Sequence, residues 1–329
     1  MRSFKWIRLM VFCVLTAFIL VAMDYALYPC TFMRNDIHAV TTQTFDDIYM
    51  GTSHGKINID PESAGKVNSR TGHNLCVGSE YPQDCYYLLR LMIETGHKPE
   101  RVIYEISPGY LVREKEEGNN YLLFYHEFPA GLAKLSYFVH SVLKCNFRTL
   151  FFPWYEYPLS YELANLPETV RAKWNKDYSI DRFRTASQEY HDSGFIARYP
   201  VNTSAFTTQD LTPASVSRIV PENMEQLRRL VSLCRKEGIR LCAVTTPIPQ
   251  PNLQASAQDY REFWEYLGAF FEEERVPWIN FNDAEHFNLF THDISTFTDM
   301  DGHMNDAAAR AFSAVLAEQL ERADPAQGS

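Results

Sequence analysis

Short apolar runs alternate along most of the chain with longer segments whose apolar side chains recur at helical spacing. The runs predict strands at 45–50, 73–77, 102–106, 240–245 and 278–281. The longer segments predict helices at 82–95, 221–237, 259–274 and 306–320. Regular alternation of this kind indicates an α/β fold, in which a single parallel sheet is flanked by helices on both faces.

Residues 113–215 interrupt this alternation. The segment is rich in aromatic residues and contains prolines, and it shows no clear strand period. We expect an insertion, partly helical, that lies over or beside the sheet. A substrate-facing lid, plain packing and contact with a membrane surface are three roles that the sequence leaves open.

The first 29 residues form a region of their own. Arg2, Lys5 and Arg8 precede the apolar stretch 9–23, and no clear small-x-small cleavage site follows it. Flanking aromatic and apolar residues extend the stretch toward the roughly 17–25 residues that a membrane span needs. We therefore expect 1–29 to be a signal anchor, with its basic end inside and residues 30–329 in the extracytoplasmic space. A cleaved signal peptide is the alternative.

Length, charge and cysteines narrow the class of protein. A chain of 329 residues forms one large α/β domain or two smaller ones. The net charge of −10 argues against non-specific nucleic-acid binding, which depends on Lys and Arg contacts to phosphates. Cys76 and Cys85 could pair in an oxidising compartment, or both could be buried thiols. The chain has no C-x-x-C or H-E-x-x-H pattern, so the sequence suggests no zinc site.

Two segments near opposite ends of the chain carry residues suited to acyl chemistry. Gly51-Thr52-Ser53-His54-Gly55 directly follows the first predicted strand, and Asp299-Met300-Asp301-Gly302-His303 precedes the last predicted helix. A serine attacks an acyl group when a histidine takes its proton and a carboxylate orients that histidine. The nucleophile elbow of α/β-hydrolases also has the form G-x-S-x-G, but that elbow follows several strands, whereas here only one precedes the serine. The spacing of 51–56 does not fit a phosphate-binding loop.

These segments resemble the SGNH/GDSL-like serine hydrolase superfamily over roughly 45–110 and 217–322. Members carry a serine motif after the first strand, an oxyanion glycine after the second, and a paired Asp and His near the C-terminus. The runs Met50-Gly51-Thr52-Ser53-His54 and His303-Met304-Asn305 look like a membrane-anchored branch of the superfamily. That branch includes relatives of the teichoic-acid D-alanyl transfer protein and of polysaccharide O-acetyltransferases.

The resemblance implies that Ser53 is the nucleophile and His303 the base, and it leaves two candidates for the acid. The family acid lies three residues before the histidine, where this chain has Met300. We expect Asp301 to be the acid, because a D-x-H form occurs among polysaccharide acetyltransferase relatives, and Asp299 is the alternative. Asp301 can reach His303 only if the chain folds back at Gly302, which glycine permits.

The oxyanion hole would use the backbone N–H groups of Ser53 and Gly78. The family's G-x-N-D block is absent, and 106–109 stands in its place, so the third donor is unknown. Asn74 is a candidate for that donor, although a capping or turn role is favoured. For His54 we expect a role in orienting the loop rather than in the chemistry.

The resemblance therefore implies an extracytoplasmic serine esterase or acyltransferase that acts on a cell-surface polysaccharide or teichoic-acid-like polymer, with no cofactor. The alternative is a non-catalytic scaffold of the same shape that binds glycan or an integral-membrane O-acyltransferase partner. The absent asparagine block and the shifted acid favour this alternative.

Overall fold

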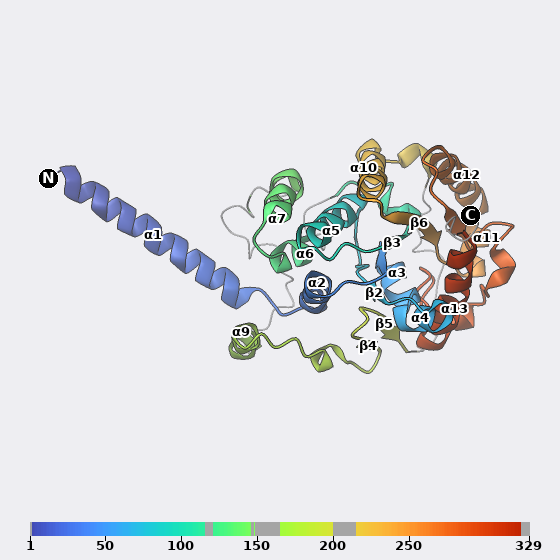
Figure 1. Ribbon diagram of the computed structural model, residues 1–329, viewed down its shortest axis with the longest axis horizontal. Helices are drawn as coiled ribbons and strands as arrows, with labels where there is room; N and C mark the ends of the chain where they lie inside the picture. The colour runs from blue at the N-terminus through green and yellow to red at the C-terminus, as the bar shows by residue number, and fades with distance from the viewer. Residues whose placement is uncertain (1, 116–120, 146–147, 149–164, 200–214, 324–329) are drawn as a thin grey trace.

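A computed structural model of the chain describes residues 2–115, 121–145, 148, 165–199 and 215–323 (Figure 1). Its centre is a five-stranded sheet in the order β2-β1-β3-β6-β7, in which every pair of neighbours is parallel. The strands are β1 (Asp47–Met50), β2 (Gly72–Asn74), β3 (Arg101–Glu105), β6 (Arg240–Thr245) and β7 (Trp278–Asn280). The prediction of an α/β fold with a single parallel sheet flanked by helices is confirmed.

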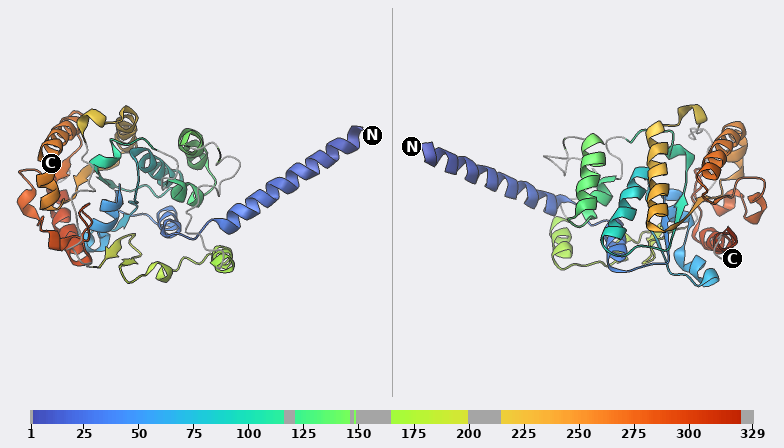
Figure 2. Two further views of the ribbon diagram at one scale, coloured as in Figure 1. Left: turned by 180° about the vertical axis from the view of Figure 1, so that it is seen from behind. Right: turned by 45° about the horizontal axis from the view of Figure 1, so that its top comes forward.

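Helices cover both faces of this sheet (Figures 1 and 2). Successive strand residues face opposite sides, so Ile48 and Met50 join one core cluster while Tyr49 joins the other. The first cluster is completed by α2 (Phe32–Thr42), α5 (Pro82–Glu94), α10 (Pro221–Glu237) and α12 (Ala257–Glu273). The second is completed mainly by α4 (Pro61–Asn68) and α13 (Asp306–Ala323). The result is a three-layer arrangement with a core on each side of the sheet.

The predicted helices are present, and several shorter ones were not predicted. Gly238 ends α10 in the left-handed conformation, with φ of 67°. The sequence pattern missed α2, α4, α3 (Ser53–Asn58) and α11 (Gln250–Ala255). Two of these four, α3 and α11, have six residues each and are too short to show two full turns of helical spacing.

The strand order creates a crevice at the carboxyl end of β1. The connection after β1 leads to β2 on one side, and the chain then crosses to β3 on the other side. In parallel sheets, ligands bind where neighbouring connections leave in opposite directions in this way. The segments that follow β1, β2 and β3 therefore surround one place, and Ser53 lies at the start of the first of them.

The described parts of 113–215 contain helices and one small sheet. The helices are α6 (Tyr121–Glu127), α7 (Leu132–Tyr137), α8 (Leu143–Cys145) and α9 (Leu166–Trp174). The segment also contains an antiparallel pair, β4 (Gln188–Tyr190) and β5 (Ile196–Arg198), which the sequence pattern did not show because strands this short display no period. Many of the aromatic residues that suggested a lid lie in 149–164, outside the described residues. The role of the insertion 113–215 as a lid therefore stays a prediction.

Helix α1 (Arg2–Leu27) extends away from the body, at the opposite end from α13 (Figure 2). Its segment Phe4–Leu27 has a mean hydropathy of 2.4 and is not covered by the body. Length and composition suit a membrane anchor or a signal sequence, and the orientation across a membrane stays a prediction.

Cys76 and Cys85 are not paired with each other. Both are buried free thiols, which is one of the two arrangements that the sequence left open.

Candidate active site

The nucleophile loop is held between β1 and β3. Gly51 has φ of +138°, and a Cβ atom at this position would lie 2.2 Å from the backbone oxygen of Glu105, so only glycine fits. The next residue, Thr52, donates from its backbone N–H and its hydroxyl to the carboxylate of Glu105, at 2.8 and 2.7 Å. Ser53 then begins α3. These contacts fix the half-buried Ser53 at the crevice.

The structure brings Ser53 and His303 together although they are 250 residues apart in the sequence. The Nε2 atom of His303 lies 2.9 Å from the Ser53 hydroxyl oxygen. On the other side of the ring, Nδ1 lies 2.7 Å from a carboxylate oxygen of Asp299. One buried imidazole thus links a serine hydroxyl to a carboxylate, which is the geometry of a Ser-His-Asp triad.

The expected contact between Asp301 and His303 is wrong, and Asp299 occupies that place. The turn does fold back at Gly302, whose φ is +110°. However, one Asp299 oxygen accepts the backbone N–H groups of Gly302 and His303, both at 3.1 Å, which leaves the other oxygen facing Nδ1. The side chain of Asp301 is exposed, and its backbone carbonyl accepts a hydrogen bond from His54 at 2.7 Å.

Arg198 is a site residue that sequence reasoning missed. It lies at the end of β5, and its guanidinium is 3.0 Å from the same Asp299 oxygen that contacts His303. Nothing in the sequence around Arg198 signals this role, because the contact depends on how a short hairpin packs beside a loop that lies a hundred residues later.

The pKa values of the pair suit a neutral base beside an ionised acid. Burial opposes ionisation of Asp299, but the hydrogen bond to His303 and the charge of Arg198 lower the pKa of its carboxyl to about 2. Burial also lowers the pKa of His303 below its usual value. The contact with Asp299 counteracts this effect, and the neighbouring His54 adds to it. At neutral pH the imidazole is therefore ready to accept a proton.

His54 packs against the base. Its ring is nearly parallel to that of His303, with the centroids 4.7 Å apart. Its Nε2 donates to the backbone carbonyl of Asp301, and its Nδ1 lies 3.3 Å from the hydroxyl of Thr52. These contacts connect the two loops of the site and agree with the loop-orienting role expected for His54.

The residues expected to form the oxyanion hole lie in adjoining loops. The N–H of Ser53 belongs to the first turn of α3, where helical N–H groups have no partner within the helix. Gly78 follows Val77, whose N–H is 3.0 Å from the backbone oxygen of Gly51 and 3.1 Å from the carboxyl of Glu80. Both expected donors therefore come from segments that are bonded to one another.

The side-chain amide of Asn74 has a structural role. Its nitrogen donates to the backbone oxygens of Gly55 and Ile59, at 2.8 and 2.7 Å, and its oxygen accepts the N–H of Cys76. These bonds hold the loop after β2 against α3, as the favoured turn role predicted. Asn58 likewise connects α3 to the histidine loop. Its amide nitrogen donates to the Gly302 carbonyl, and its amide oxygen accepts the Met304 N–H.

His54, Asp301 and His303 are the described residues nearest to a metal-ligand set, with ligand atoms within 4.8 Å of one another. Zinc ligands about 2 Å from a common ion lie roughly 3.3 Å apart. A metal held by this group would also compete with the contact between His303 and Ser53. The arrangement is better suited to proton transfer than to metal binding.

Among known proteins the chain has structural neighbours but no match by sequence. No family model matches it, and no curated protein matches it. Among solved structures it is similar to a candidate lipolytic protein of the G-D-S-L family from Desulfitobacterium hafniense DCB-2, with a TM-score of 0.40 and 10% identity over 83% of this chain and 98% of that one. It is also similar to a candidate acylhydrolase from Bacteroides fragilis NCTC 9343, with a TM-score of 0.37 and 9% identity over 84% and 86% of the two chains.

Proposed function

We propose that the chain is a serine esterase or acyltransferase of the SGNH/GDSL-like type. The observation that carries the proposal is the His303 ring, which lies 2.9 Å from the Ser53 hydroxyl and 2.7 Å from the Asp299 carboxylate. Three residues from two ends of the chain meet at the carboxyl ends of parallel strands, where such sheets bind ligands. A purely structural role would not require a half-exposed serine aligned with a buried base.

In the first half of the proposed reaction, the Ser53 oxygen attacks the acyl carbonyl while His303 takes the hydroxyl proton on Nε2. The Asp299 carboxylate stabilises the imidazolium, and the N–H groups of Ser53 and Gly78 face the developing oxyanion. The ester C–O bond then breaks, and His303 returns the proton to the leaving alcohol. A water molecule or a sugar hydroxyl attacks the acyl-enzyme by the same steps in reverse, which regenerates Ser53.

We further propose that this chemistry takes place outside the cytoplasm, on a cell-surface polysaccharide or teichoic-acid-like polymer. The resemblance of the two motifs to the membrane-anchored branch supports this substrate class. The acidic net charge supports a partner other than nucleic acid. Helix α1 supports attachment to a membrane, in which an integral-membrane O-acyltransferase would be a suitable partner.

Contacts at the base of α1 support a fixed placement of the body on a membrane. The ammonium of Lys173, on α9, donates to the backbone oxygens of Tyr25 and Tyr28 at the end of α1. The ring of Tyr28 also stacks on His126 of α6, with the centroids 4.4 Å apart. These contacts hold the body against the end of α1, so the two are not joined by a free linker alone.

Helices α7 and α9 lie at the same end of the body as α1, and both carry exposed apolar side chains (Figure 1). Leu132 and Leu135 on α7 are 71% and 59% exposed, and Trp174 at the end of α9 is 81% exposed. Tryptophan and leucine in such positions suit the boundary between a membrane and water. This end would then rest on the membrane that α1 spans.

Covalent labelling of the full-length protein tests the proposal against the non-catalytic alternative. A fluorophosphonate probe should label the wild type on Ser53. Ser53→Ala should abolish this labelling and reduce turnover of 4-nitrophenyl acetate by about 10⁴ or more, with the fold unchanged by circular dichroism. A matched control is Ser63→Ala, which alters a serine on α4 bonded to Asp60. Unlabelled wild type, or label that remains on Ser53→Ala, would favour the scaffold.

A further inference from the structure

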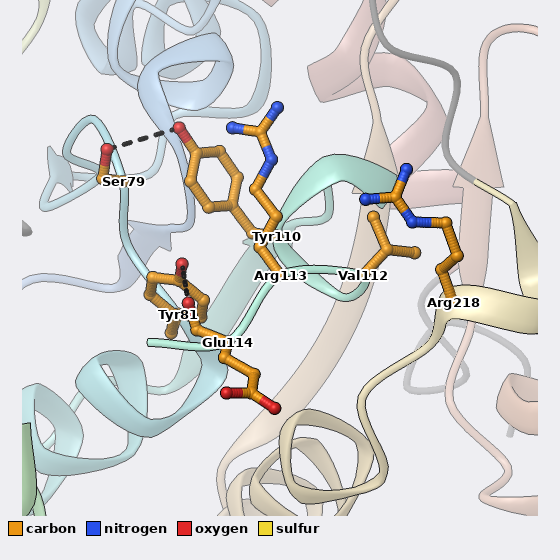
Figure 3. Close-up of a pocket in the computed structure, with 7 residues that line it drawn as sticks. All are labelled: Ser79, Tyr81, Tyr110, Val112, Arg113, Glu114 and Arg218. Atoms are coloured by element: carbon orange, nitrogen blue, oxygen red, sulfur yellow. Dashed lines mark hydrogen bonds between the residues drawn. The ribbon is translucent and has the colours of Figure 1, made fainter. Parts of the chain in front are cut away.

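A pocket of about 320 Å³ lies beyond the carboxyl ends of β2 and β3 (Figure 3). Its wall consists of residues from the loops after these two strands and of one residue from the 3₁₀ turn Val216–Arg218. The lining residues are Ser79, Tyr81, Tyr110, Val112, Arg113, Glu114 and Arg218.

Hydrogen bonds connect this pocket to the nucleophile loop. Ser79 follows two residues after Val77, whose N–H donates to the carbonyl of Gly51, and Gly51 lies two residues before Ser53. The two-residue step from Val77 to Ser79 and that from Gly51 to Ser53 each span at most about 7 Å. Tyr110 lies in the turn after β3, and the last residue of β3, Glu105, accepts a hydrogen bond from Thr52. An extended substrate with its ester at Ser53 would therefore reach the pocket.

The polar groups of the pocket are suited to an anion. The guanidinium groups of Arg113 and Arg218 both line it, and neither has an ion-pair partner among the described residues. The hydroxyls of Ser79 and Tyr110 lie 3.4 Å apart on the same side as the Arg113 guanidinium (Figure 3). Glu114, the one acidic side chain among the described lining residues, points away from both guanidinium groups in this view. Two cations and two hydroxyls thus outweigh one carboxylate.

The walls of the pocket are held in place before any ligand binds. The amide of Asn223, on α10, donates to the backbone oxygens of Tyr110 and Arg113, at 3.0 and 2.8 Å. The hydroxyl of Tyr81 donates to the backbone oxygen of Glu114. Ser79 has φ of 63°, a left-handed conformation that a serine seldom adopts and that points to a local constraint. Preorganised walls of this kind reduce the entropy lost on binding.

We propose that this pocket is a substrate subsite that binds an anionic oxygen group, a carboxylate or a phosphate, of the ester substrate that reacts at Ser53. Guanidinium groups match the planar geometry of both anions through paired N–H donors. The inference rests on the proposed function and narrows its substrate class to an acidic polymer. It also explains how a chain with a net charge of −10 could retain such a polymer, since the cations are concentrated next to the site.

Binding to polymers tests the pocket without relying on catalysis. The full-length Ser53→Ala protein, solubilised in detergent, is titrated with acetylated polygalacturonate, poly(glycerol phosphate) and neutral acetylated dextran. At least one polyanion should bind at least about tenfold more tightly than dextran, and the difference should shrink as salt is added. Adding Arg113→Gln and Arg218→Gln should remove that preference. The matched control, Lys236→Gln with Arg261→Gln, removes two exposed charges from α10 and α12 and should preserve it.

Each result decides between distinct conclusions. Preference for polygalacturonate identifies a carboxylate, and preference for poly(glycerol phosphate) identifies a phosphate. Equal binding of dextran, or a preference that survives the loss of Arg113 and Arg218, overturns the subsite. Turnover of 4-nitrophenyl acetate by the Lys236→Gln and Arg261→Gln control with Ser53 intact should equal that of the wild type. If the wild type turns over no ester while the binding pattern holds, the proposed function fails and the anion site stands.

Discussion

The Asp299 carboxylate offers the sharpest test of the site, because Asp301 serves as a natural control two residues away. In Asp299→Asn the amide oxygen can still accept the backbone N–H groups of Gly302 and His303, so the turn should persist. What is lost is the negative charge beside Nδ1. The amide nitrogen would also place a donor against the ring, which favours the wrong tautomer of His303.

The size of the electrostatic part follows from the pKa of Asp299. A decrease from 3.8 to about 2 corresponds to about 2 kcal/mol of preference for the ionised carboxyl. Solvent screening reduces this figure, since the side chain is 31% exposed. The same attraction would stabilise the imidazolium of His303 in the transition state, which alone is worth about 30-fold in rate at most. The tautomer effect adds to it, and together they reach about 10⁴ in kcat.

The assay is steady-state turnover of 4-nitrophenyl acetate near pH 7, with circular dichroism as the check on folding. Asp299→Asn should lower kcat by as much as about 10⁴-fold. Asp301→Asn should change it by less than about threefold, as expected for an exposed side chain. A larger loss for Asp301→Asn than for Asp299→Asn would refute the assignment of the acid, and full activity in both variants would refute the triad.

Four further outcomes follow from the structure. His54→Gln should move the acid limb of the kcat/KM profile to higher pH, because the electrostatic effect by which His54 lowers the pKa of His303 is removed; an unchanged limb would contradict this. Gly51→Ala should destabilise the protein by about 1–3 kcal/mol in urea titration, because its Cβ would collide with Glu105. Lys56→Met should cost about 3–5 kcal/mol, since it leaves the buried Asp36 carboxylate without its lysine partner; Lys66→Met, which alters an exposed lysine on α4, serves as control. The contacts with Lys56 and His73 outweigh the effect of burial and lower the pKa of Asp36 below 3.8, so the stability that they provide is present above about pH 4 and should be lost as the pH falls further.

The regular part of the fold could be predicted from local pattern. The strands near 240–245 and 278–281 and the helices 221–237 and 306–320 appear in the structure with nearly the predicted bounds. These elements pack one whole face or both faces against the core, so burial imposes a clear period on their residues. The small pair β4 and β5 has three residues in each strand and shows no such period.

Within the site, the sequence determined which residues are available and in what order along the chain. Ser53 after the first strand and His303 before the last helix were recognised because each belongs to a short contiguous motif. The structure placed them within hydrogen-bond distance. Local sequence also showed that a fold-back at Gly302 was permitted, since glycine adopts a positive φ cheaply, and the structure has this turn.

Only the tertiary structure decided which carboxylate faces the histidine. Asp299 and Asp301 are equally acidic in sequence, and their spacing from His303 does not distinguish them. The choice depends on the backbone N–H groups that capture one Asp299 oxygen, on Arg198 from a distant hairpin, and on His54, which holds the Asp301 carbonyl. The same is true of the pocket that contains Arg113 and Arg218, two residues joined only by packing. Contacts between segments far apart in the chain leave no local period, so no single stretch of sequence records them.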